Sequence, residues 1–128
     1  MSGVEYLLDT NFILGMLKSD PDVLNIVASK QLLASHCGYS AVTRMELLGF
    51  PGIKTEEESL IRSRLENFTY YPIDLAVEDL AIQLRRTRKV KLPDALIAAT
   101  AIFHGLQLLS LDVGLQAVIS DNDRISTK

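Results

Sequence analysis

Residues 7–14 read LLDTNFIL, which places one carboxylate and two small polar residues between two apolar runs near the start of the chain. The apolar residues before the acid predict a short buried strand over residues 4–8. In an open parallel sheet, ligands bind beyond the carboxyl ends of the strands, where the following helices present their amino ends. Asp9 therefore stands where such a sheet would bind a ligand.

The rest of the chain alternates short apolar runs with segments of helical periodicity. An alternation of this kind predicts an α/β layer structure with a largely parallel sheet. Loops are expected at residues 50–54 and in the polar tail from Ser120. Further strands are expected at residues 32–39, 69–73 and 106–111, and helices from Asp20, over residues 41–49 and 55–68, after the third strand, and over residues 93–104.

The composition indicates one compact domain. The chain has 128 residues, of which 48% are hydrophobic and 23% charged, enough for one ordinary core. A net charge of −3 gives no overall attraction for nucleic acid or an anionic membrane. Cys37 is the one cysteine, which excludes an internal disulfide and fits a reducing compartment, so we expect the cytoplasm. Neither a membrane span nor a secretory signal is expected.

Two more acids stand at positions comparable to that of Asp9. Asp112 follows the fourth predicted strand, and Asp94 follows Pro93 in the first turn of an unusually apolar helix. Free amide groups and the macrodipole at the start of a helix favour an ionised carboxylate. The three acids are therefore expected near the same edge of the sheet.

A fourth acid is indicated by the helix over residues 41–49. Val42, Met45 and Gly49 are expected to form its inward stripe, and Glu46 lies one turn beyond Val42. Carboxylates gathered in a partly buried space repel one another unless a cation compensates them. Oxygen ligands without histidine or thiolate suit a hard cation, so the cluster predicts Mg²⁺, with Mn²⁺ as a substitute.

Each acid also has an ordinary structural explanation. Asp9 could cap a helix that begins at Thr10 or Asn11, Asp94 could be a common first-turn acid, and Asp112 could belong to a turn. Glu46 could be solvated at the edge of its helix. A metal site would account for all four acids at once. Without it, four independent ordinary explanations must all be true, which is much less probable.

The segment over residues 85–91, RRTRKVK, holds five cations: Arg85, Arg86, Arg88, Lys89 and Lys91. Cations at the end of a helix complement its macrodipole, and such a segment can simply be solvated. The same cations could instead form a local patch that binds phosphate groups, such as those of a nucleic acid, despite the acidic total charge. The sequence leaves both explanations open.

Three motifs together resemble those of a PIN-domain nuclease, and more narrowly the VapC-type toxin of a VapBC toxin–antitoxin pair. They are LLDTNFIL at residues 7–14, SAVTRMELLG at residues 40–49 and LPDALIAATA at residues 92–101. The resemblance implies one three-layer PIN-like domain over residues 1–128, whose central, mostly parallel sheet of four or five strands is flanked by helices. It also implies an endoribonuclease, a VapB-type antitoxin partner and a homodimer. The residues it assigns to Mg²⁺ are Asp9, Glu46, Asp94 and Asp112, with Thr10, Asn11 and Ser110 in support.

A fourth motif of the family corresponds to SLDVGLQ at residues 110–116, and it departs from the family pattern because Leu115 stands where a further Asp is usual. This departure supports an alternative, a degenerate PIN-like module that binds RNA or protein without turnover. A phosphatase of the haloacid dehalogenase type would need a second Asp two residues after Asp9, where this chain has Asn11. A receiver domain would need a pair of acids near the first strand, and Glu5 and Asp9 do not form one.

Overall fold

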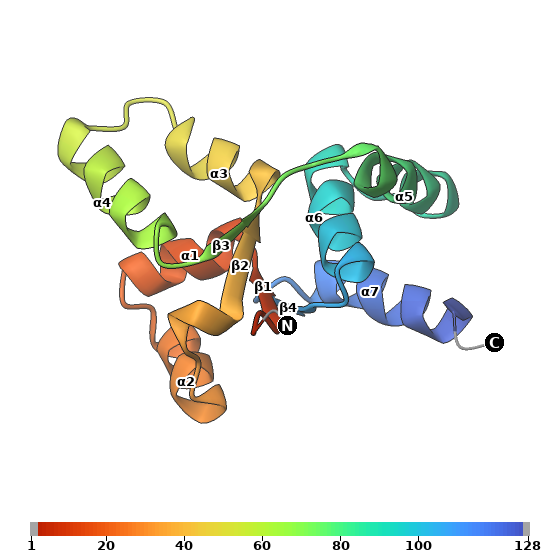
Figure 1. The fold of residues 1–128 in the computed structure, drawn as a ribbon, viewed down its shortest axis with the longest axis horizontal. Coiled ribbons are helices and arrows are strands. Elements are labelled where there is room, and N and C mark those ends of the chain that lie inside the picture. Colours follow the sequence, from red (N-terminus) through yellow and green to blue (C-terminus); the bar gives the residue numbers. More distant parts are fainter. Residues whose placement is uncertain (1–2, 127–128) are drawn as a thin grey trace.

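A parallel sheet forms the centre of the molecule. The structure is a computed structural model that describes residues 3–126, and Figure 1 shows its fold. Neighbouring strands are parallel in all three pairings, and their spatial order is β3-β2-β1-β4. The α/β layer structure expected from the sequence is therefore confirmed. The strands are β1 (Tyr6–Leu8), β2 (Cys37–Ser40), β3 (Thr69–Tyr71) and β4 (Gln107–Leu109).

Helices cover both faces of this sheet. In Figure 1 the helices α1 to α4 lie on one side of the strands and α5 to α7 on the other, which gives three layers. None of the helices in the described part of the chain has the length and apolar character needed to span a membrane. Their bounds are α1 (Thr10–Leu17), α2 (Pro21–Lys30), α3 (Ala41–Leu48), α4 (Thr55–Leu65), α5 (Leu75–Thr87), α6 (Leu92–Phe103) and α7 (Val113–Ser126).

The central strand β1 supplies side chains to two hydrophobic cores. Leu7 packs into the core beneath α5 and α6, and Leu8 packs into the core beneath α1 and α2. Both side chains are fully buried, because successive strand residues point to opposite faces of a sheet and both faces are covered. The apolar run that precedes Asp9 thus fixes the end of β1 from both sides.

Two expectations about secondary structure were wrong. The second strand does not occupy residues 32–39; it begins at Cys37, and a 3₁₀ turn over Ala34–His36 precedes it. The polar tail from Ser120 is not a loop up to residue 126, because α7 runs to Ser126. Polarity alone does not end a helix, and the sequence has no glycine or proline between Gly114 and Ser126 to stop this one.

The outer edge of β4 is covered by a side chain from α7. The amide Nε2 of Gln116 donates to the carbonyl oxygen of Leu108 at 2.9 Å and to that of Ser110 at 3.4 Å. An amide NH₂ group has two protons, so one side chain can satisfy both carbonyls. Gln116 therefore takes the place that a further strand would have along this edge.

Candidate active site

The strand order places the candidate site at the point where the chain changes direction across the sheet. From β1 the chain adds β2 and then β3 on one side, and later returns to place β4 on the other side of β1. Ligands bind at such switch points, beyond the carboxyl ends of the strands. Asp9 directly follows β1, and Ser110 directly follows β4.

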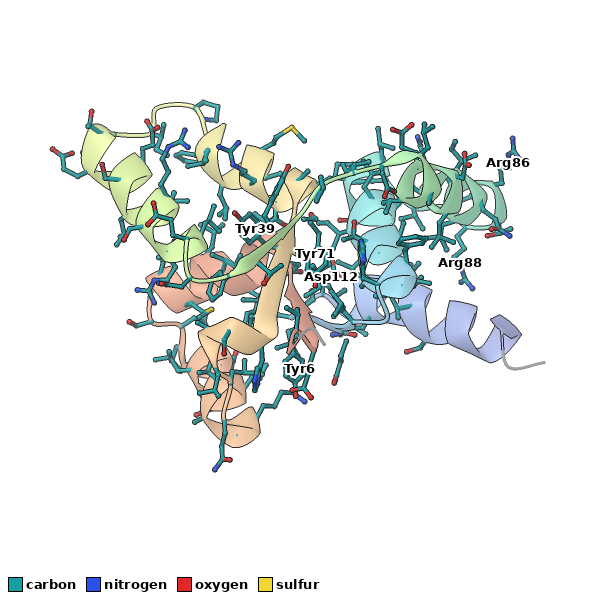
Figure 2. All side chains as sticks on the ribbon, viewed as in Figure 1. Tyr6, Tyr39, Tyr71, Arg86, Arg88 and Asp112 are labelled. Atoms are coloured by element: carbon teal, nitrogen blue, oxygen red, sulfur yellow. The ribbon has the colours of Figure 1, made fainter. Side chains whose placement is uncertain are left out.

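A cavity of about 150 Å³ lies at this position. The structure brings the four predicted acids to it from four separate places: the end of β1, the last turn of α3, the first turn of α6 and the loop before α7. Figure 2 labels one of them, Asp112, between the two helical layers. The lining residues are Asp9, Thr10, Asn11, Glu46, Asp94, Ile97, Asp112 and Leu115.

Asp9 is the most firmly held of the four acids. Its side chain is 4% exposed, and Oδ1 accepts a hydrogen bond of 2.7 Å from the backbone N–H of Phe12. The hydroxyl of Ser110 donates to the other oxygen, Oδ2. Asp9 therefore caps α1, as the ordinary structural explanation of this acid predicts. The cap uses only Oδ1, however, and Asp9 still lies on the wall of the cavity.

The four acids influence one another electrostatically. Burial raises the pKa of Asp9 above its ordinary value, and the charges of Asp112 and Asp94 raise it further, against the hydrogen bonds from Ser110 and Phe12. Burial also raises the pKa of Asp94, with Asp112 and Glu46 adding to the rise and Lys91 opposing it. Negative charge in this cavity is thus costly without a cation.

A threonine pair connects α1 to Glu46. The hydroxyl of Thr10 donates to Oε1 of Glu46 at 2.5 Å, and it lies 3.1 Å from the hydroxyl of Thr43. Because the Thr10 hydroxyl has one proton, which goes to the carboxylate, Thr43 is its donor. Thr43 was not among the residues singled out from the sequence, although the motif at residues 40–49 contains it.

The inward face of α3 differs from the predicted one. Met45 was expected inside and is 59% exposed, and Gly49 is exposed at the end of the helix, whereas Val42 is buried as predicted. Thr43 takes the buried position instead, with no exposed surface. The buried hydroxyl is satisfied by Thr10, so α3 can place this polar side chain on its buried face beside Val42 and Leu47.

The comparisons with known proteins agree with this architecture. The family model described as PIN domain matches residues 6–119. The chain belongs to the PIN-domain family. This PIN domain is 28% identical to a chain of a toxin-antitoxin complex from Klebsiella pneumoniae, with a TM-score of 0.72 and coverage of 84% of this chain and 87% of that one.

A second structure, FitAcB from Neisseria gonorrhoeae, is 27% identical to this PIN domain, with a TM-score of 0.72 and coverage of 90% and 93%. VapBC2 from Rickettsia felis, bound to a DNA fragment from its promoter, is 19% identical and shares the fold, with a TM-score of 0.73 and coverage of 90% and 93%. The comparison with curated proteins gave no match. The family resemblance drawn from the motifs is confirmed.

The donor set of this PIN domain suits a hard divalent cation, since it consists of carboxylate and hydroxyl oxygens. Among the side chains of residues 3–120, however, no three acidic, histidine or cysteine side chains are arranged so that they could hold a metal ion. Two of the four acids are engaged by hydroxyl groups, because Ser110 donates to Asp9 and Thr10 donates to Glu46. A cation would have to compete with two hydroxyl protons for these oxygens.

The cationic segment is divided by the fold. Lys89 and Lys91 line a second cavity, which also includes Asp94 and Asp112. Arg85 instead lines a separate, largely apolar cavity between α5 and α6. Figure 2 shows Arg86 and Arg88 near the end of α5, well away from Asp112. Only the two lysines of the five predicted cations therefore adjoin the acids.

Proposed function

We propose that this PIN domain is a Mg²⁺-dependent endoribonuclease and acts as the toxin of a toxin–antitoxin pair, with residues 1–128 forming one domain. The observation that carries the proposal is the convergence of Asp9, Glu46, Asp94 and Asp112 on one cavity at the carboxyl end of the sheet. Asp9 and Asp112 each also accept a backbone hydrogen bond at the start of a helix, but helix capping does not require four acids in one cavity. Burial and the charges of neighbouring acids raise the pKa values of Asp9 and Asp94, so gathering these carboxylates is a cost to the fold.

The four carboxylates would hold the cation, Mg²⁺ or, in its place, Mn²⁺. A divalent ion bound here would polarise the scissile phosphate and lower the pKa of a bound water. Asp9 supplies the most rigid oxygen, because its Oδ1 is fixed by the α1 cap. Glu46 and Asp112 are exposed, and each accepts one hydrogen bond, Glu46 from the hydroxyl of Thr10 and Asp112 from the backbone N–H of Leu115.

The neighbouring polar side chains orient these carboxylates. Ser110 donates to Asp9, and Thr10 donates to Glu46, so each hydroxyl selects one orientation of its acid. Asn11 is exposed on the cavity wall, where its amide can bind RNA or a water. Hydrolysis by an activated water needs no nucleophilic side chain, and burial raises the pKa of the Cys37 thiol to about 11, so that this thiol is inert.

The proposed partners follow from the proposed role. The Klebsiella pneumoniae structure is a toxin-antitoxin complex, which supports a VapB-type antitoxin as the partner of this chain. A cation from the antitoxin could pair with the exposed acids Glu46 and Asp112. We further propose a homodimer that acts on RNA in the cytoplasm.

The test is cleavage of a mixed pool of cellular RNA by the purified, antitoxin-free protein, in Mg²⁺ or in a chelator. We expect discrete cuts that need Mg²⁺ and that fall at least about 100-fold in Asp9→Asn, because one metal ligand is lost. Asp20→Asn is the matched control, since Asp20 caps α2 through its side chain as Asp9 caps α1 but lies outside the cavity. It should cleave at the wild-type rate.

The alternative is a PIN-like module that binds RNA or protein without turnover. Leu115 favours it, because this side chain is 5% exposed on the cavity wall where the family usually has an acid. A folded protein that binds Mg²⁺ and RNA but makes no cuts would establish this alternative. Cuts that persist in the chelator and in Asp9→Asn would exclude both.

A further inference from the structure

A second cavity opens directly beside the carboxylate cavity. It measures about 230 Å³, and both cavities are lined by Asp94, Asp112 and Leu115. Its other lining residues come from the segment that leads into α6 and from α7. They are Lys89, Val90, Lys91, Gly114 and Val118. A polymer bound at the acids can therefore continue into this second cavity without leaving the surface.

The segment over residues 89–91 is held so that its two lysines stay at the opening. Val90 is half-buried and packs against the core beneath α5 and α6. The flanking residues Arg88 and Lys91 have extended backbone, in which alternate side chains point to opposite sides. Val90 thus anchors the segment, and its neighbours in sequence, Lys89 and Lys91, remain exposed.

The charge of these lysines is available to a ligand. Neither ammonium group is within ion-pair distance of a carboxylate in the described part of the chain. Lys91 nevertheless lines the same cavity as Asp94 and Asp112. Its positive charge therefore acts on the same space in which a scissile phosphate would be bound.

We propose that this second cavity binds a phosphate adjacent to the scissile one on the RNA strand, with Lys89 and Lys91 as its cationic contacts. This inference rests on the proposed ribonuclease function. Arg85, Arg86 and Arg88, which belong to the same cationic segment, do not contribute. The half-buried side chains of Val90 and Val118 give the nucleotide between the two phosphates an apolar surface to pack against.

The first experiment measures RNA binding without cleavage. The probe is a fluorescein-labelled, single-stranded 12-nucleotide RNA of mixed sequence, titrated in Ca²⁺ with its integrity checked on a gel. Lys89→Gln/Lys91→Gln should weaken binding about tenfold at low salt and reduce the slope of log K against log salt by about 0.7 for each phosphate that the protein no longer neutralises. Lys89→Arg/Lys91→Arg should retain both the affinity and the slope.

The matched control is Arg85→Gln/Arg86→Gln, which removes the same charge from the same segment but away from the acids. We expect its affinity to change less than twofold. Equal losses in the two double variants would overturn the proposal, because the lysines would then act only through net charge. An unchanged affinity in Lys89→Gln/Lys91→Gln would overturn it as well.

A second experiment identifies the phosphate. Replacing one phosphate next to the scissile position by an uncharged methylphosphonate should weaken wild-type binding as much as the lysine double variant does. In Lys89→Gln/Lys91→Gln the same replacement should have no further effect. Additive losses would contradict the proposed interaction. In that case, Mg²⁺-dependent cuts that need Asp9 would still support the proposed ribonuclease function. A wild-type protein that makes no cuts would instead refute the proposed function itself.

Discussion

The hydroxyl of Thr10 lies 2.5 Å from Oε1 of Glu46, and this hydrogen bond joins the first turn of α1 to the last turns of α3. Glu46 is exposed and has no packing around its carboxylate to orient it. The orientation comes from Thr10, which is the residue directly after Asp9. One short segment of chain thus positions two of the four acids.

Removing the Thr10 hydroxyl should affect both stability and cleavage. In Thr10→Val the fully buried Thr43 hydroxyl loses its partner, so the free energy of unfolding should fall by about 1–2 kcal/mol. Cleavage should fall about tenfold, because Glu46 loses its orientation. Urea denaturation and RNA cleavage measure the two effects.

The same pair allows a double-mutant cycle. Thr10→Val/Thr43→Val removes both hydroxyls, so its loss of stability should be smaller than the sum of the two single losses. Strict additivity would show that the two hydroxyls do not interact. Thr87→Val serves as a control, since it removes an exposed hydroxyl that bonds only within α5, and its effect should stay below about 0.5 kcal/mol.

The metal-free protein should lose stability as the pH rises above the ordinary range for an aspartic acid. Burial raises the folded-state pKa of Asp9 above 3.8, so in the window between the two values the folded chain binds more protons than the unfolded chain. The contribution of Asp9 is then present below the window and lost as the pH rises through the raised pKa. Urea denaturation in EDTA from pH 4 to pH 8 measures this trend.

Asp9→Asn should flatten that trend and make the metal-free protein more stable than the wild type at pH 7.5. Asparagine caps a helix about as well as aspartate, so the hydrogen bond to Phe12 is kept while the buried charge is removed. Parallel pH profiles for the two proteins would contradict the assignment of this charge as a cost to the fold.

Adding Mg²⁺ should relieve the same cost. At ten times the dissociation constant, binding to the folded chain stabilises it by about 1.4 kcal/mol, which corresponds to a rise in Tm of about 3–6 °C. The rise should be smaller at pH 5, where protons compete for Asp9 and Asp94, whose pKa values are raised. Differential scanning fluorimetry measures it, and an equal rise with KCl at matched ionic strength would argue against specific binding.

Leu115→Asp should restore a carboxylate to the wall shared by the two cavities. Equilibrium dialysis with Mn²⁺ should then find about two bound ions per chain instead of one. A buried charge is costly, so the metal-free variant should lose about 3 kcal/mol of stability. Leu115→Asn is the control, because it adds polarity without charge; a second ion bound by this variant would contradict the explanation.

The positions of the acids were predictable, and their detailed environment was not. Asp9 and Asp112 follow strands, so the rule for parallel sheets places them together without knowledge of any distance. The rotation of α3 was not predictable from hydrophobicity, because the buried Thr43 and the exposed Met45 reverse the usual pattern. Local conflicts of this kind are expected where a site takes precedence over packing.

The division of the cationic segment between two places in the fold also could not be predicted from the sequence. Five cations in seven residues look like one patch, yet the end of α5 after Thr87 separates the arginines near that helix from the two lysines that lead into α6. Such a division depends on the backbone direction after residue 87, which no periodicity encodes. The predicted strands were too long, because apolar residues continue in the sequence beyond the last backbone groups that pair in the sheet. Like the division of the cationic segment, the end of pairing depends on the path of the backbone.

The hydrogen bonds of Gln116 along β4 have a consequence for the solubility of the folded chain. A sheet edge with free carbonyl groups is a template on which another chain can add a strand, and this is a common start of aggregation. Gln116 donates to two carbonyl groups along the edge strand β4, those of Leu108 and Ser110. Gly114, two residues before Gln116, lies in the first turn of α7 and lines the second cavity. The start of α7 therefore shapes the proposed binding surface and also limits the pairing of this sheet edge with another copy of the protein.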